Sequence, residues 1–299
     1  MESSASSSVD ASPDVRTKAP GRPVEIEDPS NLYLIHPISR RVAGLLVPTP
    51  VTPNMVSVAS VTFAAAGAAS YLWLASPWGA LAGLMLLIGW HVLDGADGEL
   101  ARRTGRASPI GELVDGVCDH VSQACLYVAF ALLAQPALGG LAWGLAVAAA
   151  ASHFVQSNAY ESARKTYRRW VYGAAWMRQD AMGAGGVRGL LSGLYLAVSN
   201  LTSPGEAALE AAMAGREAEP AVRDRYRALF APLVKAAGIL GGNGRTLAGF
   251  LAVMAGRPAW FFVFEITLLN AVLIGVSLWR RRCNAALAQA LLAEGRRPA

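Results

Sequence analysis

Four aspartates lie at the ends of two long apolar segments, where charged side chains are costly. Asp94 and Asp97 come near the end of one apolar run, and Asp115 and Asp119 come near the start of the next. A carboxylate at the centre of a membrane helix costs about 2.5–3.5 kcal/mol on insertion scales, so four of them need a compensating charge. Carboxylate oxygen is the ligand that Mg²⁺ and Mn²⁺ prefer. The sequence therefore predicts that all four aspartates are ligands of two divalent cations, Mg²⁺ or Mn²⁺.

Helical geometry predicts that these aspartates face each other. The spacing i, i+3, i+4 and i+7 places four residues on one helix face: Asp94, Asp97, Gly98 and Ala101. Asp115 and Asp119 are spaced i and i+4 on the next segment. A short loop joins the two segments, so we expect antiparallel neighbouring helices whose acidic faces meet. The small residues among them leave room for a ligand.

The composition is typical of a membrane protein. The chain has 299 residues, of which 54% are hydrophobic and 16% are charged, whereas soluble domains carry about 25% charged residues. We therefore predict an all-α, polytopic membrane protein. The net charge of +5 indicates basic cytoplasmic loops and contact with anionic lipid. Nucleic acid is not an expected partner, because no basic domain interleaved with aromatic residues is present.

Composition shifts along the chain predict four regions. These are a disordered tail at 1–29, an amphipathic interfacial helix at 30–47, a transmembrane catalytic domain at 48–282, and a cytoplasmic tail at 283–299. About six spans are expected, near 55–75, from 79 into the first aspartates, and near 110–134, 141–160, 246–254 and 260–279. The mixed segment 161–240 predicts cytoplasmic or interfacial helices between spans four and five.

The arginines predict how the chain is oriented. Basic clusters at 102–106, 164–169 and 280–282 fall at alternate span ends, whereas the turns at 76–78 and 135–140 have no Lys or Arg. By the positive-inside rule, we expect a cell-membrane protein with the aspartates and both termini on the cytoplasmic side.

The full pattern resembles a known family. Asp94-x-x-Asp97-Gly98-x-x-Ala101-Arg102-x8-Gly111-x3-Asp115-x3-Asp119 is similar to the complete signature of the CDP-alcohol phosphotransferases. The resemblance implies that Asp94, Asp97 and Asp115 hold the metals, and that Asp119 completes the cluster and acts as general base. It also implies a cytidine-diphosphate site that includes Gly98, Ala101, Arg102 and Gly111. Asn54, in Thr52-Pro53-Asn54, matches a weaker recurring feature of the family.

Basic residues after the fourth predicted span are candidates for the acceptor site. Arg164, Lys165 and Arg168 lie on the same predicted side as the aspartates, and Arg245 starts the fifth span. They either signal topology only or bind an anionic acceptor, since arginine recognises phosphate well. His153 is expected to be a packing residue. Glu265 is expected to face a polar cavity or another helix.

The predicted activity belongs to phospholipid biosynthesis. A substituted phosphate group moves from a CDP-linked donor, with CDP-diacylglycerol favoured, to the hydroxyl of an alcohol acceptor, and CMP is released. A choline- or ethanolamine-type phosphotransferase, with a soluble CDP-alcohol and a lipid acceptor, fits the same motif. Prenyltransferases would show two separated Asp-rich motifs, and a divalent-cation transporter would carry acidic residues near the bilayer midplane on several helices. Membrane lipid is an expected partner, and the sequence permits a homodimer.

Overall fold

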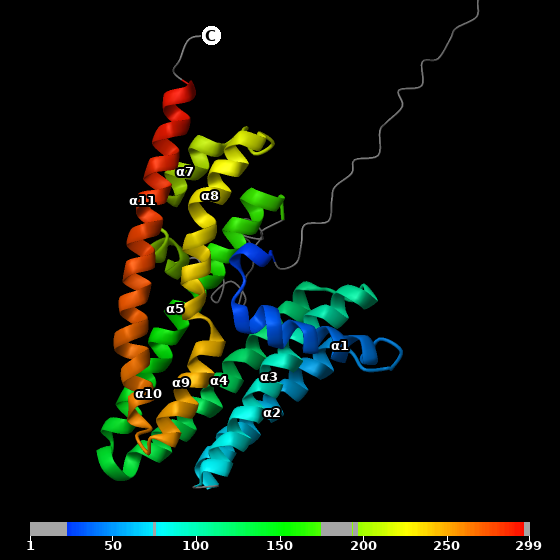
Figure 1. The fold of residues 1–299 in the computed structure, drawn as a ribbon, viewed down its shortest axis with the longest axis vertical. Helices are drawn as coiled ribbons and strands as arrows, with labels where there is room; N and C mark the ends of the chain where they lie inside the picture. Colours follow the sequence, from blue (N-terminus) through cyan, green and yellow to red (C-terminus); the bar gives the residue numbers. More distant parts are fainter. Residues whose placement is uncertain (1–22, 74–75, 175–192, 194–196, 296–299) are drawn as a thin grey trace, which may run out of the picture.

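The computed structural model describes residues 23–73, 76–174, 193 and 197–295, which form helices joined by short connections, with no strand among them (Figure 1). The longer helices are α1 (His36–Leu46), α2 (Pro53–Trp73), α3 (Pro77–Thr104), α4 (Pro109–Leu138), α5 (Leu141–Tyr172), α7 (Glu206–Met213), α8 (Pro220–Ala237), α9 (Gly242–Met254) and α11 (Asn270–Gly295). Short elements are η1 (Val24–Ile26), η2 (Asn31–Ile35), η4 (Gly238–Leu240), α10 (Ala259–Val263) and η5 (Phe264–Leu269). The all-helical prediction is confirmed.

Within the described residues, four helical segments are long and apolar enough to cross a membrane. They are Pro53–Trp73, Pro77–Thr104, Ile110–Leu138 and Ala259–Glu294. The predicted spans in α5 and α9 are not among them, so the predicted number of six is not confirmed. Parts of the predicted regions lie outside the described residues: most of the tail 1–29, residues 74–75 at the end of the first predicted span, residues 175–192 and 194–196 of the mixed segment, and the last four residues.

Local sequence signals start and stop the two helices that carry the aspartates. Ser76 caps α3 by accepting a hydrogen bond from the Gly79 amide at 3.0 Å, and Ser108 caps α4 by accepting one from the Gly111 amide at 3.1 Å. A proline at the first position of each helix removes an amide that would have no partner there. Gly105 ends α3 with a φ of 67°, in the left-handed region that glycine adopts without strain. The connection between the two acidic faces is therefore short.

Small residues bring α2 and α3 into close contact. A Cβ atom at Gly83 would collide with the Tyr71 ring, and one at Gly67 would lie 3.0 Å from Leu87. Membrane helices associate through such close packing, because lipid offers no hydrophobic driving force between them. The same core continues onto α4, α5 and α10 through Phe130 and its stacking partner Phe261. This core holds the aspartate-bearing helices at fixed positions.

A second core lies beyond the aspartates. It joins the end of α5 to α7, α8 and the second half of α11, which run side by side in the upper part of Figure 1. The predicted boundary at residue 282 falls inside the unbroken helix α11, whose Cys283 and Leu287 are buried in this core. A buried ion pair between Arg280 and Glu206, 3.1 Å apart, crosses it. Residues 283–295 thus pack as part of the helical body.

The N-terminal segment is ordered before residue 30. Ile26, within the predicted tail, is buried in the second core, and Glu25 accepts a hydrogen bond from Tyr167 at 3.0 Å. The chain then enters α1, where Ser39 donates to the Val92 carbonyl of α3 at 2.8 Å. The opposite face of α1 exposes Leu45. This two-sided helix is the element that the amphipathic pattern predicts, and its place in the membrane interface stays a prediction.

Candidate active site

Three of the four aspartates gather into one cluster. One carboxylate oxygen from each of Asp94, Asp115 and Asp119 lies within 4.8 Å of the others. These residues come from the facing ends of α3 and α4. Among the described residues, the buried Oδ1 of Asp115 has no hydrogen-bond partner. Three acidic oxygen donors, one of them buried and unpaired, fit a hard divalent cation. The predicted metal ligands on the two helices therefore come together.

Asp97 lies beside this cluster and is held differently. Its side chain is 4% exposed and accepts a hydrogen bond from the Ser57 hydroxyl of α2. Asp97 and Asp115 are close enough to interact electrostatically. Asp97 thus lies beside the three-carboxylate cluster. Ser57 gives no signal of this contact in the sequence, because a serine inside an apolar run is more often a small packing residue.

All of the residues predicted for the site line one cavity of about 860 Å³. They are Asn54, Asp94, Asp97, Gly98, Ala101, Arg102, Gly111, Asp115, Asp119, Arg164, Lys165, Arg168 and Arg245. The cavity thus brings the ends of α2, α3, α4, α5 and α9 to one space. Its size suits a substrate larger than a simple alcohol, since ligand pockets commonly measure about 300–1,000 Å³.

Two glycines keep space open beside the aspartates. A Cβ atom at Gly98 would lie 3.3 Å from the Arg102 guanidinium, and one at Gly111 would lie 3.7 Å from the Asn54 amide oxygen. Arg102 is partly exposed and pairs with Glu99 at 2.9 Å. The helix faces around the cluster are therefore open enough for a ligand to approach the backbone and the Arg102 side chain.

The basic residues of α5 face the same cavity. Glu161 pairs with Arg164 at 2.9 Å and with Lys165 at 3.6 Å. Burial would raise the pKa of Glu161, but these cations outweigh it and hold that pKa below its ordinary value. Among the described residues, the buried Nε atoms of Arg164 and Arg168 have no hydrogen-bond partner. Positive charge thus exceeds negative charge here, and guanidinium donors remain available for an anion.

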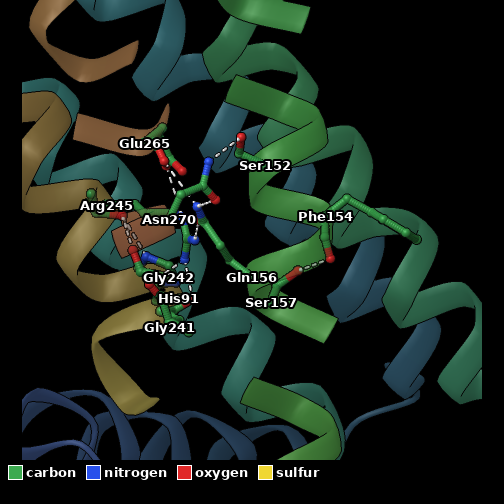
Figure 2. Close-up of polar contacts among 12 residues, drawn as sticks. His91, Ser152, Phe154, Gln156, Ser157, Gly241, Gly242, Arg245, Glu265 and Asn270 are labelled. Atoms are coloured by element: carbon green, nitrogen blue, oxygen red, sulfur yellow. Dashed lines mark hydrogen bonds and ion pairs between the residues drawn. The ribbon is translucent and has the colours of Figure 1, made fainter. Parts of the chain in front are cut away.

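Arg245 lies in a buried network instead of presenting its charge to the cavity (Figure 2). Its guanidinium donates to Glu265 at 2.9 Å, to the Gly241 carbonyl at 2.8 Å, and to Gln156. Gln156 in turn donates to Asn270 at 2.8 Å. The network ties α9 to α5 and η5, and it gives Glu265 a partner on another helix. Arg245 therefore shapes the wall of the cavity.

The N-terminal segment closes one side of the cavity, which the sequence analysis did not foresee. Asp28 and Asn31 line the cavity, and the Asn243 amide donates to Asn31 and to the Ser30 hydroxyl, both at 2.7 Å. These contacts connect residues more than 200 positions apart. A polar segment next to a Ser- and Pro-rich tail carries no signal of such a contact.

The comparisons agree with this geometry. Residues 50–180 match the family model described as CDP-alcohol phosphatidyltransferase, and this stretch includes the four aspartates and the basic residues of α5. The archaetidylinositol phosphate synthase of Aeropyrum pernix is 38% identical over 96 residues, which cover 31% of this chain and 47% of that protein. The chain thus spans about half the length of the curated relative that it matches. Residues 50–180, which carry the complete aspartate signature at one cavity, are thus similar to the CDP-alcohol phosphatidyltransferase family.

Proposed function

We propose that this chain transfers a substituted phosphate group from CDP-diacylglycerol to the hydroxyl of a polar, anionic alcohol and releases CMP. The observation that supports this most is that two groups of opposite charge line one cavity. The carboxylate cluster of α3 and α4 belongs to its lining, and so do Arg164 and Arg168 of α5, whose Nε atoms have no hydrogen-bond partner among the described residues. A metal-held pyrophosphate and an anionic acceptor would be neighbours in this arrangement.

The carboxylates would hold the donor through divalent cations, Mg²⁺ or Mn²⁺. Asp94, Asp115 and Asp119 would bind one ion, and Asp97 with its neighbour Asp115 would contribute to a second. When bound, such ions neutralise the charge of the pyrophosphate and stabilise the departing CMP. Ser57 would keep the Asp97 carboxylate in one orientation. Arg102 would donate to the nucleotide phosphates, because a guanidinium matches phosphate oxygens in geometry and charge.

The transfer itself needs a base beside the acceptor hydroxyl. The acceptor oxygen forms a bond to the phosphorus that carries the lipid, the bond from that phosphorus to the CMP oxygen breaks, and the hydroxyl proton passes to the Asp119 carboxylate. Asp119 suits this role because it lies one helical turn further along α4 than Asp115. No covalent enzyme intermediate is required when both substrates bind together.

Arg164, Lys165 and Arg168 would recognise the charge of the acceptor. A phosphorylated polyol, such as an inositol or glycerol phosphate, has the required anion and a free hydroxyl. The similar protein of Aeropyrum pernix is an archaetidylinositol phosphate synthase. Because arginine clusters mark alternate span ends, we also propose that this cavity and both termini lie on the cytoplasmic side of the membrane.

The proposal is tested with the purified full-length chain in detergent or lipid nanodiscs. CMP release is measured with Mg²⁺ or Mn²⁺, with CDP-diacylglycerol or soluble CDP-alcohols as donors, and with a panel of phosphorylated, uncharged and lipid alcohols. We expect turnover with CDP-diacylglycerol and a phosphorylated polyol. Turnover only with a soluble CDP-alcohol and a lipid acceptor would replace this donor assignment with the choline- or ethanolamine-type reaction.

A further inference from the structure

The cavity also contains uncharged polar groups that the proposed reaction does not use. Trp90 of α3, Tyr127 of α4 and His153 of α5 all line it. In each, a buried polar atom lacks a hydrogen-bond partner among the described residues: the indole Nε1, the phenol oxygen and the imidazole Nδ1. Trp90 and Tyr127 are only 3% and 5% exposed. Three helices thus each bring to the lining of this cavity a residue with a buried, unpaired polar atom.

These groups lie deeper in the bundle than the charged residues. Trp90 precedes Asp94 by one helical turn, or about 6 Å, and Tyr127 follows Asp119 by two turns, or about 12 Å. His153 precedes Glu161 by the same two turns. Because α4 runs opposite to α3 and α5, all three displacements point away from the aspartate end. The cavity therefore has a charged end and an uncharged, hydrogen-bonding end.

The chemistry of the uncharged end indicates what it can bind. An indole N–H can only donate a hydrogen bond, and a phenol donates readily. Tyr127 lies beside the Glu265 carboxylate, whose buried Oε2 also has no hydrogen-bond partner among the described residues. Arg245 interacts electrostatically with Tyr127 and His153, but it is already bonded to Glu265, Gln156 and backbone carbonyls. A ligand group here would thus be a neutral hydrogen-bond acceptor, and its arrival would pair atoms that are costly to leave unpaired.

We propose that Trp90, Tyr127 and His153 form a subsite for the ester carbonyl oxygens of the lipid substrate. This subsite proposal depends on the proposed function in one respect only, namely that one substrate is a glycerolipid. Ester carbonyls are neutral acceptors, and in a glycerolipid they lie on the membrane side of the phosphate. With the phosphate at the aspartates, they would reach the level of Trp90, one turn deeper. A water-soluble acceptor would instead meet the arginines of α5 at the charged end.

The test compares lipids with and without carbonyls. CMP release is measured with CDP-diacylglycerol and with its dialkyl ether analogue, for wild type, Trp90→Phe and Tyr127→Phe. Each variant keeps an aromatic ring and removes one donor. Tyr71→Phe is the matched control, because the Tyr71 hydroxyl is also buried and unpaired but does not line this cavity. Thermal unfolding of each variant checks that it is folded.

We expect the Trp90 and Tyr127 variants to raise the KM for the diacyl donor about 3- to 10-fold, the effect of one neutral hydrogen bond. In these variants the KM for the dialkyl donor and the KM for the acceptor should stay at their wild-type values. Tyr71→Phe should leave all three KM values unchanged. A raised acceptor KM with an unchanged donor KM would assign the subsite to the acceptor's hydroxyls and overturn the proposal. An equal rise in KM for the diacyl and the dialkyl donor would also overturn the proposal.

The test separates this subsite from the donor assignment. If wild type uses only a soluble CDP-alcohol, the donor assignment fails, and the same variants are compared with diacylglycerol and dialkylglycerol as acceptors. Selective loss with diacylglycerol would then support the subsite although the donor was wrong. Equal use of both acceptors by wild type and variants would overturn the subsite itself.

Discussion

Arg245 of α9 and Glu265 of η5 form an ion pair, with 2.9 Å between Nε and Oε1, and both side chains are at most 2% exposed. The two residues are 20 positions apart in sequence and lie on separate helices, and Gln156 of α5 joins the pair (Figure 2). It holds the start of α9 against the wall of the cavity. Because the proposed reaction gives this pair no chemical role, we expect its removal to affect stability first.

Removing one partner of this ion pair should strongly destabilise the protein. Glu265→Ala leaves the Arg245 guanidinium buried without its counter-ion, which typically costs about 3–5 kcal/mol. Thermal unfolding in detergent measures the loss. Arg225→Ala is the control, because Arg225 is half-exposed in its pair with Glu294, and exposed pairs contribute about 0–1 kcal/mol. Equal losses of thermal stability in Glu265→Ala and Arg225→Ala would contradict a structural role for the buried pair.

Turnover should depend strictly on a divalent cation. The carboxylates of Asp94, Asp115 and Asp119 lie within 4.8 Å of one another, and like charges this close need a cation between them. We expect excess chelator to abolish CMP release and Mg²⁺ or Mn²⁺ to restore it. The ion should also raise the melting temperature, because it binds the folded state. Full activity in excess chelator would be incompatible with a metal role for the cluster.

Asp119→Asn and Asp97→Asn should separate chemistry from donor binding. If Asp119 is the base, the asparagine cannot take the hydroxyl proton, and kcat should fall about 10²- to 10⁴-fold, with a smaller change in donor affinity. Asp97→Asn should weaken metal and donor binding together. CMP release measures the rates, and calorimetry with a CDP-linked donor measures the affinities. Near-normal turnover of Asp119→Asn would show that another group takes the proton.

Arg168→Ala should raise the acceptor KM and leave the donor KM nearly unchanged. Its buried Nε has no hydrogen-bond partner among the residues that the structure describes, and a charged hydrogen bond contributes about 1.5–3 kcal/mol. Arg164→Ala should have a smaller effect, because Glu161 already pairs with Arg164. The control is Arg169→Ala, since Arg169 pairs with Glu210 and lies over the Trp170 ring, away from the cavity. Equal kinetics for Arg168→Ala and Arg169→Ala would mean that the basic cluster only sets topology.

Gly98→Ala tests whether the space beside the aspartates is used. The new Cβ atom would lie 3.3 Å from the Arg102 guanidinium, so it should displace that side chain and weaken binding of the CDP-linked donor. Gly144→Ala is the matched control, because its Cβ would meet no atom within 4 Å. Calorimetry with the donor reports the change, and unchanged donor affinity in Gly98→Ala would show that Arg102 does not contact the donor.

Much of the site could be predicted from sequence, because its signals are local. The spacing of Asp94 and Asp97 places them on one face of any α-helix, and Ser108 followed by proline marks where the next helix starts. The cost of carboxylates in apolar segments indicates a cation before any contact is known. These inferences depend on geometry within a single helix or between two neighbours in sequence, so they need no knowledge of how the rest of the chain packs.

Other features were decided only by the tertiary structure, because they depend on residues distant in sequence. The Ser57 bond to Asp97, the pairing of Arg245 with Glu265, and the contact of Asn243 with Asn31 each join separate elements. The continuation of α11 past Arg282 follows from its packing on α7 and α8, which buries Leu287 and Leu291. An arginine in a sequence can face solvent, lipid phosphate or a buried carboxylate. Only the packing of the helices determines which of these surrounds it.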